Sequence, residues 1–346
     1  MGLRWNFTAI LAVSGLLSSS AAAQKPPEKP KELDILGQYV GHWTSEVTSK
    51  PAVWTPNEVK YRTSNYAEFV LDGRFLQHIE VNHVVGDPKK VTKALMVSTY
   101  DSQAGKYVTW FFQSSGMMGK STGEWNPRSK TISYSSAEPP PNTTDRFTET
   151  FPNDSTIDGN LVFTGNDGQK IFDMAWTRKR QAGVAGKLTR KQWHEIGAPI
   201  RPIPDEVKKL GPLVGTWDSE YVFRVPQRPD AKGVISDEWS LDGRFVMRRE
   251  TVGSTKSIAM IGWDDNKRAY RIARGVSNGT TNEAVGQWND ATRSLVWNWK
   301  VADDSKGVTS LATWRLVGND SIQIHVVHEK KNDVLLDLTI KMQRRK

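Results

Sequence analysis

The sequence predicts an all-β protein built from two tandem up-and-down antiparallel β-barrels of about ten strands each, of the calycin or lipocalin-like kind. Three observations support this prediction. The pentapeptide LDGRF occurs at Leu71–Phe75 and again at Leu241–Phe245, apolar and polar residues alternate through most of the chain, and Asp, Asn and Gly turn signals separate the alternating runs. Alternation with a period of two is typical of half-buried strands. A long meander of hairpins usually closes on itself, because closure removes the exposed sheet edges.

The repeat extends well beyond the pentapeptide. LGQYVGHWTSE at 36–46 matches LGPLVGTWDSE at 210–220, STYDSQAGKY at 98–107 matches IGWDDNKRAY at 261–270, and GEWN at 123–126 matches GQWN at 286–289. The matching segments keep one order while their spacing drifts, as expected of a duplication followed by changes in loop length. A period of roughly 165 residues is too long for a solenoid repeat, so each copy is expected to be a domain.

The two LDGRF segments are interpreted as hairpin turns. Asp-Gly between two β-rich runs favours a type I′ turn with positive φ at both central residues, here Asp72-Gly73 and its second copy. Asp72 and Asp242 are therefore explained as turn residues, without acid chemistry. Arg74 and Arg244 follow the turns, where they could bind an anion at a barrel mouth or form rim salt bridges.

The N-terminus is typical of a secretory signal peptide. A basic residue, an apolar run (ILAVSGLL) and three alanines occupy residues 1–23. The apolar run is far shorter than the roughly 20 residues that span a bilayer, although an uncleaved anchor is the alternative. We expect an exported protein, periplasmic or secreted. The predicted domains are a first barrel at 33–180, a basic, Pro-rich linker with a short helix at 181–206, and a second barrel at 207–346.

Composition narrows the functional classes. The 346 residues include no cysteine, so disulfides and a lipidated cysteine are excluded. The formal charge is +9, and much of the excess lies at Thr177–Lys191 and Gln343–Lys346. In an exported protein these segments are interpreted as a solvated linker and tail, with anionic envelope polymers or lipid head groups as alternative partners. Nucleic acid and a membrane-spanning arrangement are not expected.

The segments GHW at Gly41–Trp43 and GTW at Gly215–Trp217 resemble the Gly-x-Trp signature of lipocalins and the wider calycin barrels. The resemblance implies that the Trp closes one barrel end and that an Arg from a late strand packs over it. The candidates for that Arg are Arg178 or Arg180 in the first copy, with Arg178 the one assigned, and Arg344 in the second.

The order of the motifs also resembles an exported bacterial family, the domain of unknown function DUF1579. The second copy carries LVGTW, EWSLDGRF, IGWDDNKRAY and GQWN, and the first carries YVGHW, EFVLDGRF, STYDSQAGKY and GEWN. The first copy departs from the pattern at Thr99-Tyr100, where a Gly-Trp is expected. The family has no known reaction, so the resemblance implies a fold and no activity.

Catalytic and metal-binding patterns are not found in the sequence. The six histidines form no H-x-H pair and no H-E-x-x-H motif, and there is no G-x-S-x-G. We therefore assign no catalytic residue, no metal and no cofactor. His328 lies on an apolar strand face, where ten-stranded calycin relatives resembling nitrobindin hold haem through one histidine, but a buried structural histidine is the preferred interpretation.

Aromatic side chains are the remaining candidates for a binding site. Trp110, Tyr134, Trp297 and Trp299 are expected to point inward, where they either fill the barrels or line an apolar pocket. The main hypothesis is non-catalytic binding or carriage of a small apolar or amphiphilic ligand. The alternatives are an interaction module for envelope polymers or anionic surfaces, and a lipocalin-like isomerase or hydrolase.

Overall fold

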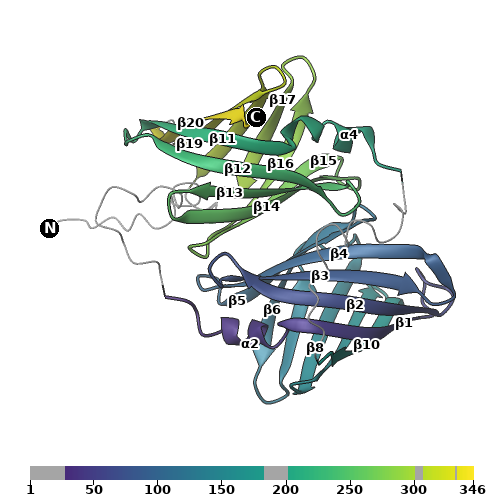
Figure 1. Ribbon diagram of the computed structural model, residues 1–346. Coiled ribbons are helices and arrows are strands. Elements are labelled where there is room, and N and C mark those ends of the chain that lie inside the picture. The colour runs from purple at the N-terminus through teal and green to yellow at the C-terminus, as the bar shows by residue number, and fades with distance from the viewer. Residues whose placement is uncertain (1–27, 183–201, 301–306, 332) are drawn as a thin grey trace. The chain divides into compact units, whose positions relative to one another are not determined.

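The computed structural model describes residues 28–182, 202–300, 307–331 and 333–346. Its described residues divide into two compact units, within Lys29–Pro202 and Ile203–Lys346. Each unit holds one closed barrel of ten antiparallel strands (Figure 1), which confirms the predicted fold class. The predicted signal peptide and most of the predicted linker lie outside the described residues. Within those residues, no helix has the length and apolarity to cross a lipid bilayer.

The first barrel begins with a short helix, α2 (Leu33–Gly37), followed by ten strands. These strands are β1 (Gly41–Lys50), β2 (Val59–Val70), β3 (Phe75–Val84), β4 (Asp87–Asp101), β5 (Lys106–Gln113), β6 (Met118–Asn126), β7 (Thr131–Ser136), β8 (Thr143–Asn153), β9 (Thr156–Gly165) and β10 (Lys170–Arg180).

The second barrel begins with the helical turns α4 (Asp205–Lys208) and η1 (Gly211–Leu213). Its strands are β11 (Gly215–Val225), β12 (Ala231–Ser240), β13 (Phe245–Val252), β14 (Thr255–Asp264), β15 (Ala269–Val276), β16 (Thr281–Asn289), β17 (Ser294–Lys300), β18 (Val308–Leu316), β19 (Ser321–Lys330) and β20 (Asp333–Arg344).

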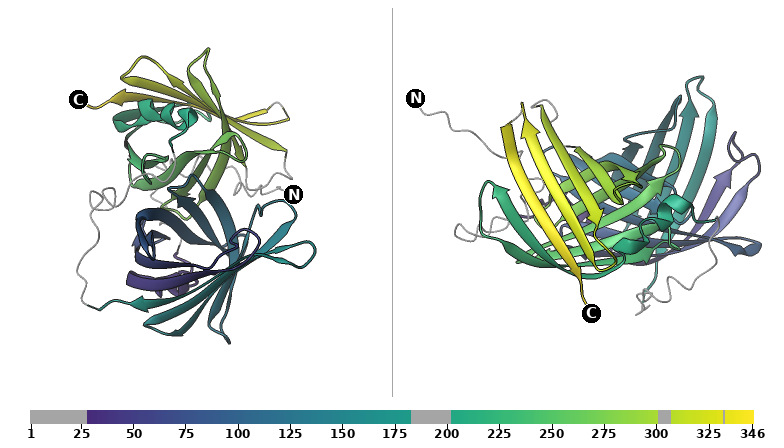
Figure 2. Two further views of the ribbon diagram at one scale, coloured as in Figure 1. Left: turned by 90° about the vertical axis from the view of Figure 1, so that its right-hand side faces the viewer. Right: turned by 90° about the horizontal axis from the view of Figure 1, so that it is seen from above.

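Both sheets close because the first strand pairs with the last. β1 pairs with β2 on one side and with β10 on the other, and β11 pairs in the same way with β12 and β20. All other pairs join strands that follow one another in the chain, so each barrel is up-and-down. Figure 2 shows the strands of each barrel curving round to meet.

The LDGRF segments are hairpin turns, as the sequence predicts, and Asp72 and Gly73 both have the predicted positive φ (58° and 80°), but the turn is centred one residue earlier. Gly73 N–H donates to Val70 O (3.1 Å) across Leu71 and Asp72, whose φ angles are 51° and 58°. The second copy repeats this geometry, with φ of 50° and 60° at 241–242. The left-handed run therefore includes both residues of each Asp-Gly pair and begins one residue before it, at a Leu.

Asp and Asn side chains shape the other turns at the same barrel ends. Asp101 and Asn126 in the first copy, and Asp264 and Asn289 in the second, each accept hydrogen bonds from backbone N–H groups two or three residues on. These local bonds mimic a backbone turn. They explain why the repeated motifs carry an acid or amide after an aromatic residue.

The Gly-x-Trp segments close the barrel ends where β1 and β11 begin. Trp43 and Trp217 are almost fully buried, and their indole N–H groups donate to the carbonyls of Tyr39 (2.7 Å) and Leu213 (2.8 Å). A second hydrogen bond comes from the tyrosine that ends each of the repeated segments 98–107 and 261–270. The hydroxyls of Tyr107 and Tyr270 donate to the carbonyls of Glu32 and Glu206, beside or within the helical segments. Each helix is thereby fixed across its barrel end.

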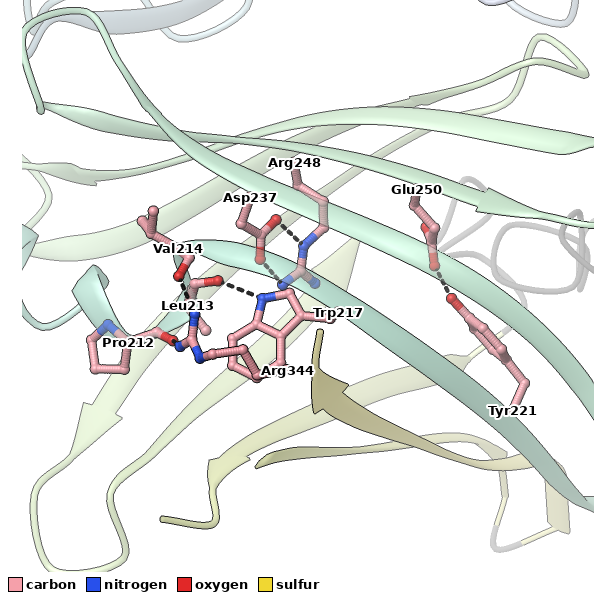
Figure 3. Close-up of polar contacts among 9 residues, drawn as sticks. All are labelled: Pro212, Leu213, Val214, Trp217, Tyr221, Asp237, Arg248, Glu250 and Arg344. Atoms are coloured by element: carbon pink, nitrogen blue, oxygen red, sulfur yellow. Dashed lines mark hydrogen bonds and ion pairs between the residues drawn. The ribbon is translucent and has the colours of Figure 1, made fainter. Parts of the chain in front are cut away.

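A late arginine packs over each closing tryptophan. The Arg344 guanidinium lies 4.1 Å from the Trp217 ring centre and donates to two carbonyls of the η1 turn, as Figure 3 shows. In the first barrel the equivalent residue is Arg180, 4.2 Å from Trp43. The assignment of Arg178 was therefore wrong: Arg180 is the cross-strand partner of Trp43, whereas Arg178 pairs with Ser45 and points into the lumen.

Glycine is required opposite several inward aromatic rings. Gly123 pairs with Tyr134, and Gly286 pairs with Trp297, so that each ring lies over the glycine. A Cβ on Gly286 would be 2.6 Å from the indole of Trp297, and one on Gly123 would overlap the Tyr134 ring. The glycine of the repeated G-x-W-N motif therefore makes space for a core aromatic residue on the next strand.

We expect Gly123→Ala to destabilise the first barrel by about 1–3 kcal/mol, because the new methyl group overpacks the core against Tyr134. The matched control is Gly119→Ala on the same strand, where a Cβ meets no atom within 4 Å. That substitution should be neutral or stabilising by up to about 1 kcal/mol. Urea unfolding of both variants checks this, and equal destabilisation would contradict the packing assigned to Gly123.

Candidate functional site

The strand register places three of the four predicted aromatic residues inside the barrels. Tyr134 is buried in the first lumen, Trp297 is fully buried in the second, and Trp299 is partly exposed on the same strand face as Trp297. Trp110 is on the other face of β5 from Tyr107, which belongs to the barrel core. The expectation that Trp110 points inward was wrong.

Arg74 and Arg244 follow the turns at the closed barrel ends, where the helical segments lie. Their side chains are buried, and burial lowers the pKa of Arg74. They therefore lie at the opposite end of each barrel from its mouth. The lumen residues do not include them.

The lumen of the first barrel is only partly filled. Its apolar cluster extends from α2 to Phe147, at the closed end. From Phe147 toward the other end, five inward apolar side chains stay partly exposed: Met96, Phe111, Phe147, Leu161 and Met174. Gly119 is also inward on β6, paired with Phe111, and a Cβ there would meet no atom within 4 Å. These inward side chains are therefore less completely covered than those at the closed end.

The second lumen is filled. At the positions that correspond in register to the five residues above, all side chains are buried: Ala259, Arg274, Ala312, Val326 and Leu338. One continuous cluster extends from Trp217 at the closed end to Phe223 and Leu336 toward the other end. The two copies therefore share a fold and differ in the content of their lumens.

A polar cluster forms the floor of the open lumen in the first barrel. The Glu149 carboxylate on β8 accepts hydrogen bonds from Tyr39 (2.6 Å) and Trp176 (3.1 Å) and pairs with Arg178 (2.9 Å). A second carboxylate, Glu80 on β3, lies 3.6 Å from the same guanidinium. Burial acts to lower the pKa of Arg178, but the charges of Glu149 and Glu80 outweigh it and raise that pKa.

Three buried polar groups beside this cluster have no hydrogen-bond partner among the described residues. They are both amide atoms of Asn65, Nε2 of His78 and Nε of Arg178. Asn65 is cross-strand neighbour to Glu80, and His78 is two residues before Glu80 on the same strand face. Burial, assisted by the charge of Arg178, holds the pKa of His78 well below its usual value, so the ring is neutral. An unsatisfied buried polar group costs free energy, and a ligand's polar end could satisfy these.

The second barrel contains a polar network that is already satisfied (Figure 3). Asp237 and Arg248 form a bidentate ion pair (2.7 and 2.8 Å). Glu250 accepts hydrogen bonds from Tyr221 and Ser257 and pairs with Arg274 (2.6 Å). Glu250 occupies the same place in the strand register as Glu80. Among the described residues, the other charged groups of the two clusters are at positions that do not correspond. The network is paired internally, in contrast to the first floor.

Two further features were considered as sites. A hollow of about 530 Å³ lies against the outer face of β1, β2 and β10, lined by polar residues such as Glu46, Arg62 and Lys179. Most of its lining residues are on the outer strand faces, although the inward Ser45 and Thr63 also line it. Among the described residues, no three His, Asp or Glu side chains are grouped as a metal site. His325 does bond Asp337 (2.9 Å), but on the exposed outer face of β19 and β20.

The sequence analysis missed the floor residues Asn65, His78, Glu80 and Glu149. Each lies on the inward face of its strand, and alternation could have indicated that face for each strand separately. What alternation cannot indicate is that β2, β3, β8 and β10 bring these side chains together, because this follows from closure of the sheet.

Residues 28–178 match a family model described as "Protein of unknown function (DUF1579)". This segment is the first barrel, and the match confirms the resemblance drawn from its motifs. No curated protein matches the chain.

Solved structures also match the chain. An S-type phycobiliprotein lyase, CPES from Guillardia theta, is 11% identical over 43% of this chain and 91% of its own, with a TM-score of 0.32. Rv2717c from M. tuberculosis is 15% identical over 44% and 99%, with a TM-score of 0.35. A protein of unknown function from the DUF3598 family of Nostoc punctiforme is 10% identical over 92% and 100%, with a TM-score of 0.26. At these scores the matches carry no functional argument.

We expect His328 to make the second barrel sensitive to acid. The side chain is inward and 3% exposed, and burial lowers its pKa to about 4. The unfolded chain takes up this proton near pH 6.5, so unfolding is favoured as the pH falls from about 6.5 toward 4, by about 1.4 kcal/mol per pH unit. Urea unfolding at several pH values should show this slope, and His328→Leu should reduce it. An unchanged slope in the variant would contradict a neutral, buried His328.

Proposed function

We propose that the first barrel binds a small amphiphilic molecule without catalysis, and that the chain does so after export. The observation that carries the proposal is the pairing of partly exposed apolar walls with unpartnered polar groups at the floor of one lumen. An apolar body would lie against Met96, Phe111 and Leu161. Its polar end would reach Asn65 and His78. Barrels of this size can hold one small ligand, and such sites combine apolar walls with a few orienting polar groups.

The charge of the floor restricts the polar end of the ligand. Two carboxylates, Glu80 and Glu149, face one guanidinium, Arg178. A further anion would be buried beside an existing excess of negative charge, which is costly. Asn65 offers both a donor and an acceptor, and a neutral His78 offers either. The floor therefore favours an uncharged hydroxyl or amide, or a cation, over a carboxylate.

The second barrel is proposed not to bind the same ligand. Its lumen is filled by the cluster around Trp297 and Trp314, and its buried charges are paired with one another. Two of the basic side chains that the polyanion-binding alternative needs are engaged within the first barrel. Arg178 pairs inside the lumen and Arg180 packs over Trp43, while the basic residues from 183 to 191 lie outside the described part of the chain.

We expect Gly119→Leu to weaken binding of a neutral fluorescent amphiphile, the methyl ester of dansylaminoundecanoic acid, at least tenfold, because the side chain would occupy the free space of the lumen. The matched control is Glu124→Leu, on the exposed outer face of the same strand. It should bind like the unchanged protein. Fluorescence titration measures both affinities, and equal affinities for Gly119→Leu and the control would sink the lumen assignment.

The floor is tested with the same probe and its free acid. We expect the neutral ester to bind at least tenfold more tightly than the carboxylate. Asn65→Leu should weaken ester binding without lowering stability, since removal of an unsatisfied buried amide is not costly. Tighter binding of the free acid would overturn the assigned charge preference while leaving the lumen itself in place.

A further inference from the structure

The open end of the first barrel has an apolar rim. The described part of this barrel exposes four large hydrophobic side chains: Val53 (54%), Trp54 (49%), Val85 (50%) and Met117 (59%). All four lie in loops between β1 and β2, β3 and β4, or β5 and β6. In an up-and-down barrel these three loops lie at one end, opposite the end that α2 closes, and they are neighbours along the rim.

The rim is continuous with the lumen. Trp54 packs against Phe163, an inward residue of β9, with the ring centres 5.4 Å apart and the planes tilted by 45°. Phe163 in turn contacts Phe172 of β10, with ring centres 6.1 Å apart. The Trp54 backbone N–H donates to Ile171 O (2.9 Å), which holds the loop against the mouth. An apolar path therefore leads from the exposed rim to the partly exposed walls of the lumen.

Lysines flank the same three loops. The strand ends and loops that border them carry Lys50, Lys60, Lys89, Lys90 and Lys120, against the carboxylates Glu58 and Asp87. Lys60 and Lys90 form ion pairs with Glu58 and Asp87 at 3.4 and 3.3 Å, with all four side chains well exposed, so water screens the pairs. Lys50 lies 3.6 Å from the buried carboxylate of Asp173 on β10. The acidic Glu138 and Asp167 are on the other loops of the mouth, which expose no large apolar side chain among the described residues.

We propose that this rim docks on an anionic lipid bilayer, with Trp54 and Met117 inserted at the interface and the lysines beside the head groups. Trp favours membrane interfaces, and basic residues around an apolar patch add attraction to anionic lipids. The purpose assigned to docking rests on the proposed function, because the bilayer would be the source or destination of the amphiphile. The docking itself can be measured separately from occupancy of the lumen.

The test is sedimentation of the chain from Gln24 onward with vesicles of phosphatidylcholine alone or with 30% phosphatidylglycerol, since the apolar run at 10–17 could itself bind lipid. We expect binding to the anionic vesicles. The double substitution Trp54→Ser and Met117→Ser should raise the half-saturating lipid concentration at least tenfold. Lys89→Gln with Lys90→Gln should raise it by about fivefold per lysine on anionic vesicles only. Higher salt should weaken binding in the unchanged protein.

The matched control is Leu311→Ser with Val317→Ser, which removes two equally exposed apolar side chains from the second barrel. It should bind vesicles like the unchanged protein. No vesicle binding by the unchanged protein, or equal loss in both double variants, would overturn the inference. A rim-dependent dimer without lipid binding, measured by light scattering, would also overturn it and assign the rim to a second copy of the chain.

The two proposals fail in distinguishable ways. The rim variants keep the floor and the walls, so they should still bind the soluble dansyl ester in the absence of vesicles. Loss of vesicle binding with ester binding retained supports docking at the rim. Vesicle binding without any ester binding would keep the rim and refute the proposed ligand site.

Discussion

The pairing of the first strand with the last is the constraint on which each half of this protein depends. The register that joins β1 to β10 sets Trp43 opposite Arg180, and the register that joins β11 to β20 sets Trp217 opposite Arg344. Stacking of the guanidinium on the indole therefore follows directly from closure. Closure also leaves no free edge in either described sheet, which suits a chain without a single cysteine for disulfides.

With the closed end fixed, the two lumens were free to differ. Both copies keep the turns, the helical segments across the end, the tryptophan and its arginine. Inside, they share a glutamate at Glu80 and Glu250 but pair it differently: with Arg178 from β10 in the first copy and with Arg274 from β15 in the second. The first arrangement leaves polar groups without partners and apolar walls partly exposed. The second satisfies its charges and fills its core, so a site for a ligand is supported in the first barrel alone.

The fold was predictable because the signals that specify it are local. Turn residues, alternation and the repeated landmarks each act over a few residues, and two copies of the same order make coincidence implausible. The turn geometry was less predictable, because the left-handed pair includes Leu71, a residue type that rarely takes positive φ.

The site was largely beyond reach of the sequence, for two physical reasons. Trp110 was placed inward because it shares a face with Phe112, but both faces of β5 are apolar and period two alone does not select one. Glu149 and Arg178 are 29 residues apart and are joined to Glu80 only when ten strands close into a cylinder. The misassigned Arg178 shows the same limit: it lies two residues from the correct Arg180, on the same strand face, but one step deeper in the lumen.

The difference between an open and a filled lumen can be measured directly, because the chain has no cysteine of its own. Single cysteines at two equivalent inward positions, Gly119→Cys on β6 and Asn282→Cys on β16, would be treated with a small apolar thiol reagent under native conditions. The account predicts rapid labelling of Gly119→Cys, slowed by the dansyl ester, and labelling of Asn282→Cys only on unfolding. Equal protection of both thiols would show that the first barrel is as solid as the second and would contradict a binding lumen.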